Sequence, residues 1–211
     1  MSTKIVCALL QMIVLFSITT TAQAQQFPNN EFKKWGEYGC PESWSCNNDA
    51  DCRGKVTKAD KIKGGAKLTV MHCFDPAKED RSNNVNMSYD ELSAKISKGK
   101  KVKISFDYSY TPVGNDEAYI KIDADFDEEV NNAFPMFTYN DSDNGTLKPG
   151  TNVHAECFLN FNPSGAKQLV SPQACNANSI RTAFGIMPAA NTTDVHKGST
   201  LVIYRIKIEI I

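Results

Sequence analysis

The chain has 211 residues, and its 23 lysines and arginines nearly balance its 24 aspartates and glutamates, for a formal net charge of −1. This balance argues against nucleic acid or an anionic membrane as the main partner, because both are bound through strongly basic surfaces. The length is typical of one domain with a sizeable hydrophobic core.

The first 24 residues have the pattern of a cleavable export signal. A positive start at Lys4 is followed by an apolar run over residues 5–16, and Ala22-Gln23-Ala24 forms an A-x-A cleavage site. The apolar run is shorter than the roughly 20 residues that a membrane-spanning helix needs. We therefore expect a secreted protein without a membrane span, with residues 25–211 forming a single β-sandwich domain.

Six of the seven cysteines follow the signal, and in an oxidising compartment an even number is typical of disulfide bonds. The sequence leaves their pairing open. A zinc site that uses the first three with His72 and its neighbouring cysteine is the alternative, but the spacings are wider than those of common zinc motifs. The cysteines expected to form up to three disulfides are Cys40, Cys46, Cys52, Cys73, Cys157 and Cys175.

Alternation of apolar and polar residues is the dominant pattern along the chain, and it predicts β-strands with one buried and one solvated face. Short strands are expected at Ala66–Val70 and at 180–187. Longer strands are expected over residues 102–110, 118–126, 153–161 and 202–210.

In the last of these strands, the pattern places Val202, Tyr204 and Ile206 on one face. Residues 89–97 alone resemble a helical turn, because Leu92 and Ile96 lie four positions apart. Segments rich in glycine, proline and asparagine separate the strands. The pattern as a whole predicts an all-β fold, with two antiparallel sheets packed face to face as a β-sandwich.

An acidic segment, in which Asp123, Asp125 and Asp127 share one strand face, can be interpreted in two ways. Several carboxylates together suit calcium, although the spacing of an EF-hand loop is not met. A solvated polar face that protects a sheet edge is the interpretation we favour.

Aromatic and polar side chains on two predicted strands suggest a ligand site. Tyr119 and Phe158 point outward by alternation, and aromatic rings can stack on the flat faces of sugars. If the two strands are neighbours, these rings form one patch with polar groups around them. Trp35, Tyr38 and Trp44 lie near the N-terminus, where core packing is the favoured interpretation of the tryptophans.

Catalytic patterns are weak. Asp123 and Glu156 are the best pair of carboxylates for glycosidase chemistry, which needs two acids on either side of one bond. The histidines His72, His154 and His196 are scattered and have no recognisable nucleophile beside them. We therefore expect a protein that is not an enzyme.

Three motifs follow one another in the order found in a known family. They are Asn29-Asn30-Glu31-Phe32-Lys33-Lys34-Trp35 followed by Pro41-Glu42-Ser43-Trp44, Gly99-Lys100-Lys101-Val102-Lys103-Ile104-Ser105-Phe106, and Gly198-Ser199-Thr200-Leu201-Val202-Ile203-Tyr204-Arg205-Ile206-Lys207-Ile208. This order resembles carbohydrate-binding modules of the family 4/9 type, and it spans nearly the whole mature chain.

The resemblance implies a galactose-binding-like jelly roll that binds glycan on a concave sheet face or at loop tips. It also implies a structural calcium, for which Glu31 would match the ligand on the first strand. Tyr204 and Arg205 stand where the family has its closing aspartate, which weakens the calcium expectation.

These observations predict a secreted, non-catalytic module that recognises an extracellular or cell-wall polysaccharide. A structural or adhesive protein that engages protein or matrix is the alternative, and a jelly-roll glycosidase or lyase is third. The expected ligand-binding residues are Tyr119, Lys121, Asp123, His154, Glu156, Phe158 and Arg181.

Overall fold

The computed structural model describes residues 26–37, 39–46, 54–59, 64–71, 85–97, 100–126, 130–137, 145–163, 177–188 and 196–211. Within these ranges the regular secondary structure consists of β-strands, and all the strand pairs are antiparallel. None of the described segments contains a helix with the length and hydropathy of a membrane span. The expected export signal lies outside these ranges.

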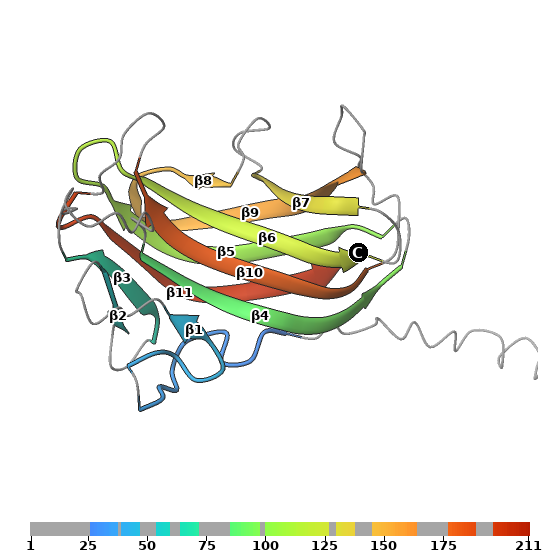
Figure 1. The fold of residues 1–211 in the computed structure, drawn as a ribbon, viewed down its shortest axis with the longest axis horizontal. Helices are drawn as coiled ribbons and strands as arrows, with labels where there is room; N and C mark the ends of the chain where they lie inside the picture. Colours follow the sequence, from blue (N-terminus) through green and yellow to red (C-terminus); the bar gives the residue numbers. More distant parts are fainter. Residues whose placement is uncertain are drawn as a thin grey trace, which may run out of the picture.

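The strands form two sheets that pack face to face (Figure 1). The five-stranded sheet contains, in spatial order, β1 (Ser45–Cys46), β4 (Val85–Ile96), β10 (Ala177–Met187), β6 (Glu117–Phe126) and β8 (Thr146–Leu147). The six-stranded sheet contains β2 (Gly54–Lys58), β3 (Ala66–Val70), β11 (Thr200–Ile210), β5 (Val102–Thr111), β9 (Gly150–Pro163) and β7 (Val130–Phe137).

The chain passes repeatedly from one sheet to the other, for example from β4 to β5, then to β6, and again from β9 through β10 to β11. Such crossing connections between antiparallel sheets are the mark of a jelly roll. The predicted antiparallel β-sandwich with jelly-roll connections is therefore confirmed.

The core lies between the sheets and follows the predicted alternation. On β5, Ile104, Phe106 and Tyr108 are buried, while Lys103 and Asp107 on the opposite face remain partly exposed. Burial of each such large apolar side chain stabilises the fold by about 1.5–3 kcal/mol. Because the core takes every second residue, the residues between them are presented on the outer face of the sheet.

β11 departs from the predicted pattern at one point. Ile203 pairs with Tyr108 and Arg205 pairs with Asp107, so Tyr204 is an extra residue that forms a β-bulge. The bulge reverses the alternation: Leu201 and Ile203 are buried before it, and Ile206 and Ile208 after it. The prediction that Val202, Tyr204 and Ile206 share one face was therefore wrong.

The predicted helical turn at 89–97 was also wrong, because these residues belong to β4. Register shifts along its pairing with β10 leave extra residues between Tyr89 and Leu92 and between Ser93 and Ile96. These irregularities break the period of two. Leu92 and Ile96 are both buried, and their four-residue spacing imitates a helical face.

The N-terminal segment completes the edge of β11 beyond the point where β3 ends. The side-chain amide of Gln26 donates to the carbonyl of Ile208 at 2.8 Å, and its oxygen accepts the Ile208 N–H at 3.1 Å. The Ile206 N–H donates to the carbonyl of Asn30 at 3.0 Å. The segment thereby satisfies backbone groups that would otherwise form an open edge.

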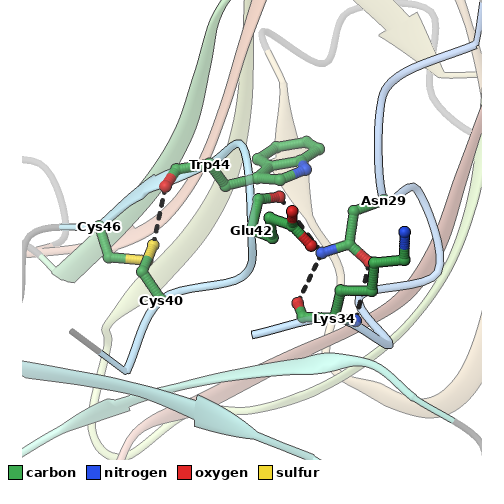
Figure 2. Close-up of a disulfide and its surroundings, with 6 residues drawn as sticks. All are labelled: Asn29, Lys34, Cys40, Glu42, Trp44 and Cys46. Carbon is green, nitrogen blue, oxygen red and sulfur yellow. Dashed lines mark hydrogen bonds between the residues drawn. A yellow bond between two sulfur atoms is a disulfide. The ribbon is translucent and has the colours of Figure 1, made fainter. Parts of the chain in front are cut away.

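A disulfide between Cys40 and Cys46 closes the N-terminal loop, as Figure 2 shows, and confirms the predicted oxidation of these two cysteines. Asn29 organises the same loop (Figure 2), because its side-chain amide donates to the carbonyls of Lys34 and Glu42 at 2.7 and 3.2 Å. Its φ of 50° is a conformation that asparagine tolerates better than most residues.

Trp44 packs inward from this loop. The residue is 6% exposed, and its ring contacts Phe27, Phe32 and Tyr89 and donates its Nε1–H to the carbonyl of Pro28 at 3.0 Å. Trp35 is partly buried against the core and donates to the carbonyl of Phe32 at 2.8 Å. Core packing, the favoured interpretation of the tryptophans, is confirmed.

Cys157 does not form the disulfide that was expected of it. It is a free thiol with no solvent exposure, opposite Ile104 on the inward face of the six-stranded sheet. Burial raises the pKa of this thiol to about 12, so the reactive thiolate is suppressed. The alternation that puts Cys157 in the core explains why it is an apolar packing residue. Cys52, Cys73 and Cys175 lie outside the described residues.

Candidate functional site

A groove of about 680 Å³ lies on the outer face of the six-stranded sheet. Side chains of β5, β9 and β11 line it, together with Gln26, Asn30 and Glu31 of the N-terminal segment. The hydrogen bonds of Gln26 and Asn30 to β11 hold this segment in place as one side of the groove.

The strand register arranges the outward side chains in rows that cross the sheet. The rows, from β11 through β5 to β9, are Arg205–Asp107–His154, Lys207–Ser105–Glu156 and Glu209–Lys103–Phe158. Directly opposite residues on neighbouring strands are close enough to interact, so each row forms a unit of side-chain contacts.

In the first row, Asp107 lies between two basic groups. His154 Nδ1 is 2.6 Å from Asp107 Oδ1, and a guanidinium nitrogen of Arg205 is 3.7 Å from Oδ2. His154 Nε2 also lies 3.5 Å from Glu156 Oε1. The hydrogen bond to Asp107, and more weakly that to Glu156, raises the pKa of His154 because both carboxylates favour the imidazolium.

The other two rows are joined by lysines. Lys103 Nζ lies 2.5 Å from Glu156 and 3.9 Å from Glu209, while Lys207 Nζ lies 2.7 Å from Glu209. The hydrogen bond from Lys103 lowers the pKa of Glu156, and that from Lys207 lowers the pKa of Glu209. Both carboxylates are therefore held ionised as hydrogen-bond acceptors.

Ser105 forms the middle of the floor. It is flanked by Lys207 and Glu156 in its own row, and by Lys103 and Asp107 along β5. Its side chain is the smallest in the three rows, and the residue as a whole is 9% exposed. The short hydroxyl leaves a hollow with donors and acceptors on every side.

The structure brings together three of the seven predicted ligand-binding residues. His154 and Glu156 line the groove, and Phe158 lies next to Lys103 on the same face of β9. Tyr119, Lys121 and Asp123 are on β6, and Arg181 is on β10. These four residues belong to the other sheet.

The single aromatic patch expected from Tyr119 and Phe158 is therefore wrong. It required their strands to be neighbours, but β6 pairs with β10 and β8, whereas β9 pairs with β5 and β7. The two outward faces lie on opposite sides of the sandwich. Alternation predicts which side chains point outward, but it does not say to which sheet a strand belongs.

Tyr119 covers Gly185 on the outer face of the five-stranded sheet. A Cβ at Gly185 would lie 2.5 Å from the Tyr119 ring, so the glycine makes room for it. Burial of the ring raises the pKa of the phenol. Lys121 and Arg181 are exposed further along the same two strands, and the backbone places Asp123 opposite Arg181. The side chain of Asp123 lies outside the described residues.

Most of the groove residues were not anticipated as ligand-binding. Lys103, Ser105 and Asp107 alternate with the core residues of β5, and this alternation could have identified them as groove residues. Arg205, Lys207 and Glu209 alternate with the buried residues Ile206 and Ile208, so the pattern places these three outward as well. The bulge at Tyr204 upsets the predicted pattern only for the residues that precede it.

The surroundings of Glu31 do not fit the implied calcium ion. Its carboxylate forms an ion pair with Lys33, and Lys33 and, more weakly, Arg205 lower its pKa. A divalent cation requires several oxygen ligands and is repelled by such cations. Within the described part of the chain, no three acidic, histidine or cysteine side chains are grouped to hold a metal.

Asp116 forms a second polar cluster between two turns. Its buried carboxylate accepts hydrogen bonds from Ser199 Oγ at 2.5 Å, from the His196 N–H at 2.8 Å, and from His196 Nδ1 at 2.8 Å. Ser199 bonds to the aspartate and not to the imidazole, so this is not the arrangement of a catalytic triad. The cluster instead ties the turn after β5 to the turn before β11.

No family model matches the sequence, and no curated protein matches it. Solved structures with a similar fold include a family 11 carbohydrate-binding module from Clostridium thermocellum in complex with a β-1,3-1,4-mixed-linked tetrasaccharide. It is 13% identical, with a TM-score of 0.40, and the match covers 88% of this chain and 95% of that one.

Two further solved structures differ in their described roles. A putative sugar-binding protein from Bacteroides thetaiotaomicron is 13% identical, with coverage of 89% and 94% and a TM-score of 0.43. A cyclase from Fischerella sp. TAU is 10% identical, with coverage of 89% and 98% and a TM-score of 0.48. The structural neighbours thus include carbohydrate-binding modules and an enzyme.

Proposed function

We propose that the protein is a secreted, non-catalytic carbohydrate-binding module that holds an extracellular or cell-wall polysaccharide in the groove of the six-stranded sheet. One observation carries this proposal: the three cross-strand rows place hydrogen-bond donors and acceptors side by side around the hollow at Ser105. The resemblance to modules of the family 4/9 type agrees with it.

Sugar hydroxyls suit this arrangement because each one both donates and accepts hydrogen bonds. The groove offers carboxylates such as Asp107 and Glu156 as acceptors, and Arg205 and Lys207 as donors. Bonds to ionised groups are stronger than those between neutral groups. Arg205 and Lys207 are 59% and 53% exposed, so both can reach a ligand.

The electrostatics favour binding over hydrolysis. A glycosidase needs a carboxylic acid whose pKa is raised, so that it can protonate the leaving group. Lys103 and Lys207 instead lower the pKa values of Glu156 and Glu209. These two groove carboxylates are therefore suited to accept hydrogen bonds from hydroxyls.

Affinity gel electrophoresis over a panel of mixed-linkage glucan, xylan, galactan and hydroxyethyl cellulose tests the proposal. We expect retardation by at least one polymer. The variant His154→Ala/Glu156→Ala should lose it, as should Ser105→Tyr, which fills the hollow.

The matched control is Tyr119→Ala/Lys121→Ala, which alters the outer face of the other sheet and should retain binding. Thermal unfolding of each variant verifies that it is folded. Absence of retardation with every polymer would contradict glycan binding. Loss of retardation in the control alone would show that the groove is not the site.

A further inference from the structure

We infer that the groove selects uncharged polysaccharides and discriminates against polyanionic ones, such as polymers that contain uronic acids. This inference rests on the proposed function and adds the charge class of its ligand.

The charge of the groove is the first argument. Its described lining contains four carboxylates, Glu31, Asp107, Glu156 and Glu209, against the three cations Lys103, Arg205 and Lys207. Protonation of His154 brings the formal charge of this set from −1 to zero. Lys33 pairs with Glu31 from outside this lining, and counting it brings the set to zero, or to +1 when His154 is protonated. Neither state has the clear excess of positive charge that a site for a polyanion needs.

The pairing of the cations is the second argument. Lys103 contacts two carboxylates, Lys207 contacts Glu209, and Arg205 approaches Asp107. An anionic sugar would have to compete with these carboxylates for each cation. A hydroxyl can accept from a lysine and donate to its carboxylate partner at the same time, so an uncharged sugar keeps the pairs intact.

The third argument is that the carboxylates resist protonation. Lys103, Lys207 and Lys33 lower the pKa values of Glu156, Glu209 and Glu31, so these groups keep their negative charge at mildly acidic pH. The carboxylate partners of the lysines therefore stay ionised, and their competition with an anionic sugar for each cation persists at mildly acidic pH.

A matched pair of ligands tests the inference. The neutral polymer of the panel that retards the protein is compared with its own carboxymethylated derivative at equal chain length. At about 10 mM salt, where screening extends over about 30 Å, we expect the derivative to bind at least about tenfold more weakly. At about 1 M salt, where the screening length is about 3 Å, the difference in affinity between the two polymers should fall to less than about threefold.

Charge-neutralising variants give a second measurement. Glu31→Gln/Glu209→Gln should bind the carboxymethylated polymer at least about threefold more tightly than the unaltered protein at low salt. Glu117→Gln, on the strand β6 of the other sheet, is the matched control and should leave both affinities unchanged.

Three outcomes would overturn the inference. Equal or tighter binding of the carboxymethylated polymer would overturn it and leave the proposed function standing. If the difference in affinity between the two polymers persists at high salt, the weaker binding comes from the size of the added groups and not from their charge. That result would also overturn the inference. If no neutral polymer is bound, the proposed function fails and the inference fails with it.

Discussion

The imidazole Nδ1–H of His154 donates a hydrogen bond to the carboxylate of Asp107 at 2.6 Å, across the paired strands β9 and β5. Arg205 approaches the other carboxylate oxygen from β11 at 3.7 Å. One acidic residue thus connects three strands on the open face of the sheet. This contact fixes the orientation of His154, which lines the groove.

Replacement of Asp107 by asparagine should lower the pKa of His154, because it removes the largest cause of its elevation. A pH titration of the imidazole carbon resonances of His154 by NMR, in the unaltered protein and in the variant, measures this. An unchanged His154 titration in Asp107→Asn would contradict the contact.

The same contact makes a small part of the stability depend on pH. Since folding raises the pKa of His154, its contribution is fully present below the ordinary value near 6.5 and is lost as the pH rises through the folded value. His154 is 59% exposed, so the effect is at most about 1 kcal/mol. Urea unfolding at a series of pH values should show this decline in the unaltered protein and a smaller one in Asp107→Asn, where Glu156 still favours the imidazolium.

Gly185→Ala should destabilise the five-stranded sheet by about 1–3 kcal/mol, because the added methyl group would lie 2.5 Å from the Tyr119 ring. Tyr119→Ala should relieve part of this cost when the two changes are combined. Urea unfolding of both single variants and the double variant measures the coupling.

Gly36→Ala is the control for this pair. There the added Cβ would be 3.7 Å from the nearest atom, which is an ordinary contact, so the change should be small. Additive effects of Gly185→Ala and Tyr119→Ala would mean that the ring does not cover the glycine.

Cys157 should resist alkylation in the folded protein and react only after denaturation, because it is buried and its pKa is raised to about 12. Iodoacetamide treatment in buffer and in guanidinium chloride, followed by peptide mass spectrometry, distinguishes the two states. The same maps should show Cys40 and Cys46 joined. Recovery of Cys157 in a disulfide-linked peptide would be incompatible with the structure.

Asp116→Ala should cost about 3 kcal/mol or more, since it leaves Ser199 and the His196 N–H without their buried acceptor. For a chain of this size, that corresponds to a fall in Tm of roughly 6–12 °C. Differential scanning calorimetry measures it, and Glu117→Gln, at the adjacent and more exposed position, should change Tm by little. A fall in Tm no larger than that of the control would show that the polar cluster around Asp116 does not hold the two turns together.

The sandwich could be predicted because its strands carry regular alternation, as β5 does with Ile104, Phe106 and Tyr108 facing the core. The two failures of that pattern, at β4 and β11, both come from extra residues that reverse the phase. A bulge adds one residue to a strand without requiring a particular residue type. The sequence therefore does not mark its position, and only the register of the paired strands reveals it.

The site was predicted less well than the fold. His154 and Glu156 were found because alternation places them outward, but Tyr119 was grouped with them although it lies on the other sheet. Membership of a sheet depends on pairings between strands far apart in the sequence, such as β5 with β11. Local patterns do not contain that information.

The most direct test of the groove is to map changes in backbone amide chemical shifts by NMR while an oligosaccharide is added. The oligosaccharide is a fragment of the polysaccharide that retards the protein in the gel. We predict that the largest shifts fall on the central rows of the six-stranded sheet, around Ser105, His154 and Lys207. Shifts centred instead on Tyr119 and Arg181, with the groove unperturbed, would contradict the account.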